Sequence, residues 1–239
     1  MSFDPLYKVR QAFADGRISD RIFQLVSKRF PLVTEGIQRV EMASGLKFPY
    51  YYVEPSMVVS TSAAEFSQMG IFFARTIPVI GNDRYLRVVV QVTAPLIAYG
   101  LKGTIHAILA HEFMHYLELV GRIIKMNIIS DEVTGTLFEG TYSDSSRLLE
   151  ESVVFKPDPT LIRHITKRFP EGFRDFRVED KAIKFWMEKG LPVTNVPIDA
   201  NTVKIPVESM ARLQVDQSVR DKLAEYEGAR GKKRSQKYV

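Results

Sequence analysis

Residues 105–119 have the sequence Ile-His-Ala-Ile-Leu-Ala-His-Glu-Phe-Met-His-Tyr-Leu-Glu-Leu, with the pattern His-Glu-x-x-His at 111–115. Neither Pro nor Gly interrupts residues 104–120, so the stretch predicts one continuous and largely apolar helix. Side chains four positions apart on a helix lie on one face, about one turn from each other. We therefore expect His111 and His115 to point in the same direction, and Gly121 to end the helix.

The spacing of the two histidines suits a metal ion. Two imidazoles one helical turn apart can occupy adjacent coordination positions of one zinc ion. Glu112 is badly placed to be a ligand itself, but it can reach a metal-bound water, which makes it the candidate general base. The alternative is a chance pair of packed histidines, because the motif is short. The apolar flanks, a strand pattern before the motif and acidic residues after it favour one zinc ion per chain.

The composition limits the classes of protein and of metal site. The chain has 239 residues, 45% of them hydrophobic and 26% charged, as in ordinary globular proteins. It contains no Cys, so disulfides and thiolate zinc sites are excluded and a metal must be bound by His, Asp or Glu. The net charge of +5 permits an acidic partner without identifying one.

The distribution of apolar residues indicates the compartment. No apolar run approaches the roughly 18 residues of a membrane-spanning helix. The first residues, MSFDPLYKVRQAF, include an early acid and lack an apolar core of signal-peptide length. We expect a cytoplasmic protein that does not associate with membranes.

The pattern along the chain predicts an α+β fold. Residues 1–45 have helical spacing, with Ser19 or Asp20 capping one helix, Thr34 capping the next and Gly45 ending it. We expect a mixed or antiparallel sheet of about four strands, packed against the motif helix, with N-terminal helices and a helical C-terminal part. The expected strands, the last two joined by a hairpin at 81–84, are 49–53, 57–61, 70–80 and 85–93.

Strands followed by HEFMH at 111–115 give the chain a family resemblance. Over roughly residues 48–155 it resembles the zincin metallopeptidases, and in particular their glutamate-ligand branch, the gluzincins. The resemblance implies peptide-bond hydrolysis by a zinc-bound water, with Glu112 as the general base. It also implies a peptide or protein substrate that lies extended along an edge strand within 70–93.

A catalytic zinc usually takes three protein ligands and a water, so a third ligand is needed. No His follows His115 at the spacing that another zincin branch uses, which favours an acid. In gluzincins this acid lies early in the helix after the motif helix, and residues 147–155 predict such a helix. We expect Glu151, which lies beside the apolar stripe, then Glu150, then Glu139. The full set of acidic candidates is Asp131, Glu132, Glu139, Asp144, Glu150 and Glu151.

Some residues depart from the pattern or have no assigned role. The gluzincin signature Glu-x-x-x-Asp is not matched, because position 155 is Phe. Tyr142, Arg147 and His164 are candidates for stabilising the oxyanion. His106 lies off the ligand face and is expected to be structural. Glu118 follows the motif on the ligand face and is either an orienting group for an imidazole or a surface acid.

The C-terminal part predicts a division of the chain. We expect a catalytic domain at 1–156, a helical subdomain at 157–227 and a basic, disordered tail at 228–239. The tail favours weak nucleic-acid contact. The alternative function is therefore a latent or inactive zincin-fold protein that binds nucleic acid or a protein partner through its tail. Residues 193–207 are a candidate internal inhibitor lying across the active site.

Overall fold

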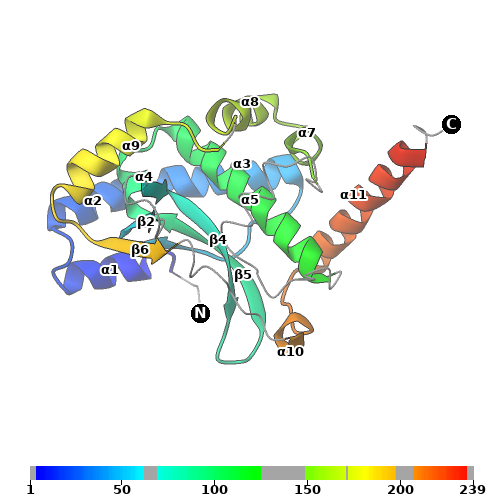
Figure 1. Ribbon diagram of the computed structural model, residues 1–239, viewed down its shortest axis with the longest axis horizontal. Helices are drawn as coiled ribbons and strands as arrows, with labels where there is room; N and C mark the ends of the chain where they lie inside the picture. The colour runs from blue at the N-terminus through cyan, green and yellow to red at the C-terminus, as the bar shows by residue number, and fades with distance from the viewer. Residues whose placement is uncertain (1–3, 62–68, 125–148, 171, 198–206, 236–239) are drawn as a thin grey trace.

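Helix α5 (Lys102–Ile124) carries the His-Glu-x-x-His pattern and crosses the middle of the molecule (Figure 1). The computed structural model describes residues 4–61, 69–124, 149–170, 172–197 and 207–235. Nearly every α5 side chain from Thr104 to Val120 is buried, because helices and strands pack against it on several sides. The predicted long apolar helix is thus confirmed.

The C-terminal end of α5 corrects one prediction. The helix continues through Gly121 to Ile124 instead of ending at the glycine. Ile123 is only 1% exposed, and a Cβ at Gly121 would lie 3.9 Å from the Leu223 methyl groups of α11 (Gln217–Ser235). Burial of this last turn outweighs the cost of about 1 kcal/mol for a glycine inside a helix.

The N-terminal helices are α1 (Tyr7–Ala14), α2 (Asp20–Arg29) and α3 (Pro31–Ser44). Ser19 caps α2, and Gly45 ends α3 with φ 70°, both as predicted. The expected cap at Thr34 is wrong, because α3 already starts at Pro31, whose missing N–H is tolerated in the first turn. Gly36 permits close packing of α3 on α5, since a Cβ there would lie 2.7 Å from Leu109 Cδ1.

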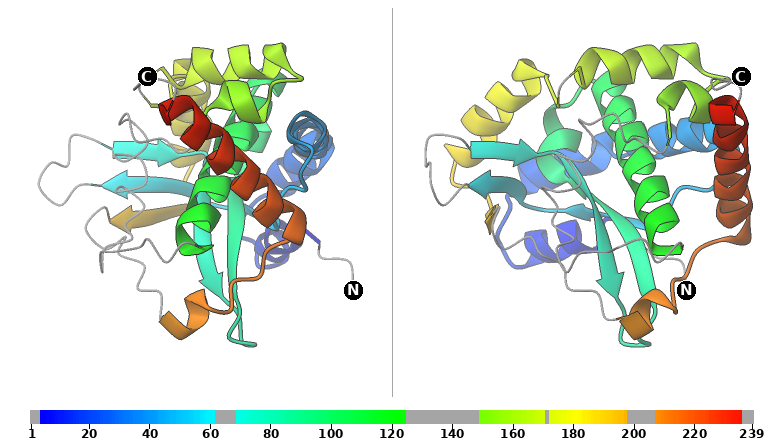
Figure 2. Two further views of the ribbon diagram at one scale, coloured as in Figure 1. Left: turned by 90° about the vertical axis from the view of Figure 1, so that its right-hand side faces the viewer. Right: turned by 45° about the vertical axis from the view of Figure 1, so that its right-hand side comes forward.

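The first sheet has the order β1 (Tyr51–Glu54), β5 (Leu86–Thr93), β4 (Ala74–Ile80). Strand β1 is parallel to β5, and β4 is antiparallel to β5. The hairpin predicted at 81–84 joins β4 to β5 and extends toward α10 (Val207–Met210) in Figures 1 and 2. Among the described residues β4 pairs only with β5, so it is an edge strand beside α5.

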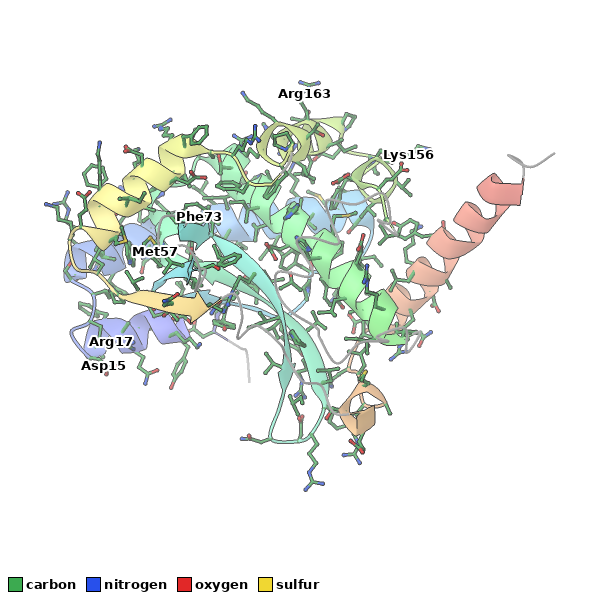
Figure 3. The ribbon with its side chains drawn as sticks, in the orientation of Figure 1. Asp15, Arg17, Met57, Phe73, Lys156 and Arg163 are labelled. Carbon is green, nitrogen blue, oxygen red and sulfur yellow. The ribbon has the colours of Figure 1, made fainter. Side chains whose placement is uncertain are left out.

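The second sheet corrects the prediction of a single sheet of about four strands. It has the order β3 (Met69–Phe72), β2 (Met57–Thr61), β6 (Val193–Pro197), with β3 antiparallel and β6 parallel to β2. The single strand expected at 70–80 is divided at Phe73 into β3 and β4, which belong to different sheets (Phe73 is labelled in Figure 3). Local β propensity predicts an extended backbone but says nothing about where the chain changes partners.

Strand β6 also bears on the internal-inhibitor hypothesis. Residues 193–197 pair in register with β2 in the second sheet. A parallel strand at this place joins the C-terminal part of the chain to the second sheet. Residues 193–197 are thus part of a sheet, residues 198–206 lie outside the described part of the chain, and the inhibitor hypothesis stays a prediction.

After residue 148 the described elements are mainly helical, as expected. They are α7 (Glu151–Val154), α8 (Pro159–Arg168), α9 (Phe176–Ala182) continued by the π-helical turn η1 (Ile183–Met187), β6, α10 and α11. They do not form a separate core. Trp186 packs in one cluster with Val90 and Leu109, and Leu161 packs in another with Leu117. The expected subdomain at 157–227 thus shares both hydrophobic clusters with the first half of the chain.

Helix α11 extends beyond residue 228, where the basic tail was expected to begin. It runs to Ser235, and its C-terminal half projects from the body in Figure 1. Its first half is docked through Val219 and Leu223, which are 1% and 7% exposed. A docked first half removes the cost of nucleation, and Ala, Lys and Arg in the second half offset part of the cost of Gly228 and Gly231. Within the described segments, no helix is both long and apolar enough to cross a membrane.

Candidate metal centre

The side chains of His111 and His115 converge on one face of α5. Their Nε2 atoms lie 2.8 Å apart, and the two rings meet edge to face with centroids 4.4 Å apart. His115 is 8% exposed and His111 is half-buried, so the pair lies at the boundary of the core. The shared direction predicted from the spacing is confirmed.

Two imidazole nitrogens at this separation fit a shared cation in their donor chemistry. Zinc–nitrogen bonds are about 2.0–2.1 Å long, so two nitrogens on one tetrahedral zinc ion lie about 3.3–3.4 Å apart. The observed separation of 2.8 Å is shorter, so the two rings must move apart by about 0.5 Å to bind one zinc ion. The observed separation suits a hydrogen bond from one Nε2–H to the unprotonated Nε2 of the other ring.

The third ligand stays a prediction. The described residues contain no group of three or more His, Asp or Glu side chains placed to hold one ion. Glu150 is the exposed residue before α7, and Glu151 is the half-buried first residue of that helix. The remaining acidic candidates, Asp131, Glu132, Glu139 and Asp144, lie outside the described residues.

Glu112 is held by the edge strand. Its side chain is 7% exposed, and Thr76 Oγ1 on β4 lies 2.8 Å from Glu112 Oε2 and 3.0 Å from the Glu112 backbone oxygen. The carboxyl oxygen and the backbone oxygen both belong to Glu112. The Thr76 hydroxyl therefore restricts the rotation of the Glu112 side chain relative to the Glu112 backbone. Sequence reasoning missed Thr76, because its role depends on the packing of β4 against α5.

An aromatic wall fixes the plane of the His111 ring. Phe169, just after α8, stacks on His111 with ring centroids 3.8 Å apart and an interplanar angle of 9°. Phe173 lies next to Phe169 and next to Phe73, at centroid distances of 5.4 and 5.3 Å. The wall presents apolar surface to one side of the histidine pair. No motif in the sequence indicated Phe169 for this place.

The other histidines lie elsewhere. His106 is 1% exposed and packs against Gly36, and its Nδ1 lies 3.5 Å from Arg39. Burial, followed by the Arg39 charge, lowers the pKa of His106, which favours the neutral ring. Its structural assignment agrees with this position.

Of the three oxyanion candidates, the structure describes only His164, and it does not lie at the histidine pair. His164 lies against Gly103, eight residues before His111 and therefore about 12 Å away along the helix. Burial and the neighbouring Arg168 lower the pKa of His164. Tyr142 and Arg147 lie outside the described residues. Glu118 is 2% exposed, so it is not a surface acid.

Comparisons with protein-family models, with curated proteins and with solved structures found no significant match. The assignment of a function therefore depends on the geometry around His111, Glu112 and His115.

Proposed function

We propose that the protein is a zinc-dependent metallopeptidase of the zincin type, with Glu112 as its general base. The observation that carries the proposal is the convergence of the two Nε2 atoms, 2.8 Å apart, on the same helix as Glu112, whose carboxylate Thr76 orients. Zinc-assisted hydrolysis can use nitrogen ligands and a general base on one rigid element, and α5 carries both.

Each residue of the proposed site has a separate role. His111 and His115 hold the ion, and Phe169 keeps the His111 ring in its plane. When bound, zinc supplies a Lewis acid that polarises the scissile carbonyl and makes water more acidic. Glu112 removes the proton from the attacking water and returns it to the leaving amine. Glu151 remains the proposed third ligand, with Glu150 and then Glu139 as alternatives.

The edge strand supports a peptide as the substrate. Thr76 links β4 directly to Glu112, so a chain paired with the outer side of β4 lies next to the base. Adding a peptide strand satisfies backbone groups that an edge strand leaves open. The Phe169 wall limits the access of water to the reacting groups from its side.

Metal analysis and peptide cleavage together test the proposal. We expect about one zinc per chain in protein purified without chelator, as for other single-site zinc proteins. His111→Ala should lose the metal. Glu112→Gln should keep it but cleave peptides at least about 100-fold more slowly, because only the base is removed. Glu150→Gln and Glu151→Gln identify the third ligand by which of them weakens zinc binding.

Glu208→Gln is the matched control, because Glu208 is exposed on α10. It should leave both zinc content and cleavage unchanged. Absence of zinc after reconstitution, or equal zinc content in wild type and His111→Ala, would overturn the proposal. Zinc binding without any peptide cleavage would leave a metal site and reject the peptidase.

A second candidate is a latent or inactive zincin-fold protein that binds nucleic acid or a protein partner through the end of the chain. Residues 228–239 carry five basic side chains and no acidic one: Arg230, Lys232, Lys233, Arg234 and Lys237. The end of α11 also projects from the body in Figure 1. A salt-sensitive affinity for an oligonucleotide, lost when the chain is cut after Glu227, favours this alternative.

A further inference from the structure

Arg75 lies beside Thr76 on β4 but on the opposite face of the sheet. Its register partner is Gln91, and Gln91 pairs in turn with Tyr52. Arg75 Nε donates to Gln91 Oε1 at 2.9 Å, while Gln91 Nε2 lies 3.0 Å from the Tyr52 hydroxyl and 3.1 Å from Glu54 Oε2. The three side chains form a polar row across the sheet that ends at the edge strand.

The charge of Arg75 is only weakly compensated. The side chain is half-buried, and its one hydrogen bond within the described residues goes to a neutral amide. Glu54 is already paired with Lys8, at 3.2 Å. Burial lowers the pKa of Arg75, although Tyr52, Glu54 and Glu112 act in the opposite direction. A guanidinium that has lost water without gaining an anion has unused binding capacity.

Two other half-buried arginines show the contrast. Arg39 forms a two-pronged pair with Asp158, and Arg168 lies 3.7 Å from Asp175. Each has a carboxylate partner within the protein. In the described part of the chain, Arg75 has no such partner within ion-pair distance.

The hydrogen-bond pattern of β4 determines how a peptide would pair with it. Phe73 accepts from the Thr93 N–H and Gly81 donates to Tyr85, so the odd-numbered residues of β4 direct their backbone groups toward β5. The even-numbered residues direct theirs to the open edge. Thr76 therefore offers both an N–H and a C=O to an added strand. Pro78 offers only its C=O, which shortens the available ladder.

This geometry relates Arg75 to one position of the peptide. Side chains of paired strands alternate together, so the peptide residue opposite Thr76 directs its side chain to the α5 face. The next residue directs its side chain to the Arg75 face. This side-chain placement is the same for a parallel and for an antiparallel peptide, because side chains alternate between the two faces in both kinds of pairing.

We propose that Arg75 is a specificity residue that binds an acidic side chain of the peptide, one position away from the residue opposite Thr76. The peptide as ligand rests on the proposed function. A carboxylate can take two parallel hydrogen bonds from the guanidinium Nη atoms, and such charge-assisted pairs are about twice as strong as neutral ones. Arg75 thereby selects substrates by charge, while Glu112 acts on the other face of the same edge.

The test is a cleavage profile of full-length, zinc-loaded protein on a proteome-derived peptide library, with cleavage sites read by mass spectrometry. In wild type we expect Asp or Glu to be favoured over Asn or Gln about 10-fold or more at one subsite. Arg75→Gln should abolish this preference, Arg75→Lys should keep part of it, and Arg75→Glu should favour Lys and Arg there. Arg163→Gln is the control, because Arg163 extends outward from α8 in Figure 3.

A binding experiment separates this inference from the proposed function. The same library is passed over immobilised Glu112→Gln protein with Arg75 or with Arg75→Gln, and retained peptides are identified. Acidic peptides enriched only by the Arg75 protein, without cleavage by wild type, would reject the peptidase and keep the inference. Identical cleavage profiles for wild type, Arg75→Gln and Arg75→Glu, or identical retention by the Arg75 and the Arg75→Gln proteins, would overturn the inference and leave the peptidase standing.

Discussion

The single hydroxyl proton of Thr76 is shared between two acceptor oxygens of one residue, Glu112. The Thr76 hydroxyl lies 2.8 Å from the carboxyl Oε2 and 3.0 Å from the backbone oxygen of Glu112. A carboxylate on a flexible side chain loses rotamer freedom when it is held in this way, and a general base acts efficiently only from a fixed position. Thr76 is therefore a positioning residue in the proposed reaction.

Replacing Thr76 by Val should lower kcat about 10- to 100-fold, the effect usual for groups that orient a metal-site residue. Zinc content and KM should change little, because Val has a similar shape and neither zinc nor peptide loses a direct ligand. Steady-state kinetics with metal analysis measures both effects. Thr76→Ser restores the hydroxyl and should recover most of kcat. Equal activity of Thr76→Val and wild type would reject the positioning role.

At the scale of elements, one ion pair joins α3 to the start of α8. Arg39 bonds both carboxyl oxygens of Asp158, at 2.6 and 2.9 Å, and Asp158 also accepts from the Leu161 N–H as the cap of α8. Both helices pack on α5, so the Arg39–Asp158 ion pair fixes the positions of the two helices that flank the motif helix. The hydrogen bonds from Arg39 are the main cause of the lowered pKa of Asp158.

Asp158→Asn should destabilise the protein by about 1–2 kcal/mol at pH 7, because the charged pair is lost while Asn still caps the helix. Asp158→Ala should cost about 1 kcal/mol more, because the cap is lost too. The folded-state pKa of Asp158 lies below its ordinary value of 3.8, so its contribution is complete above that pH and disappears as the pH falls through the lowered pKa.

Denaturant unfolding in the presence of chelator, from pH 7 down to pH 2, measures this dependence. The difference in unfolding free energy between wild type and Asp158→Asn should narrow only in the acidic part of the range. A difference that stays constant over the whole range would show that the Arg39–Asp158 charge pair contributes nothing.

At the scale of the whole molecule, the site is assembled from three parts of the chain. Helix α5 provides the histidines and Glu112, β4 provides Thr76 and Arg75, and the end of α8 provides Phe169. Each of these parts packs around α5. The residues that hold the site in place therefore also form the hydrophobic core. A ligand that binds the histidine pair is thereby linked to the stability of the whole fold.

Zinc should raise the thermal stability of the wild type and not that of His111→Ala. At a free zinc concentration 100 times the dissociation constant, the expected stabilisation is about 2.7 kcal/mol. Thermal unfolding with added zinc, and again after chelation, measures the gain and its reversal. An equal shift in His111→Ala would place the bound zinc somewhere else on the chain.

The sequence was sufficient for features that depend on neighbours along the chain. The side by side placement of His111 and His115 follows from the helical repeat, and the cap at Ser19, the end of α3 at Gly45 and the hairpin at 81–84 follow from local backbone preferences. The α+β class follows from the same periodicities. These interactions span only a few residues, so their physical causes are contained in short stretches.

The tertiary structure determines which distant residues meet. It divided 70–80 at Phe73 between two sheets, brought β6 from the C-terminal part to β2 and carried α5 past Gly121. It also placed Thr76 on Glu112, 36 positions away, and Phe169 on His111. Such contacts depend on which apolar faces cover each other in the folded chain. Strand propensity and helical periodicity describe each face but not its partner, because many pairings bury similar apolar area.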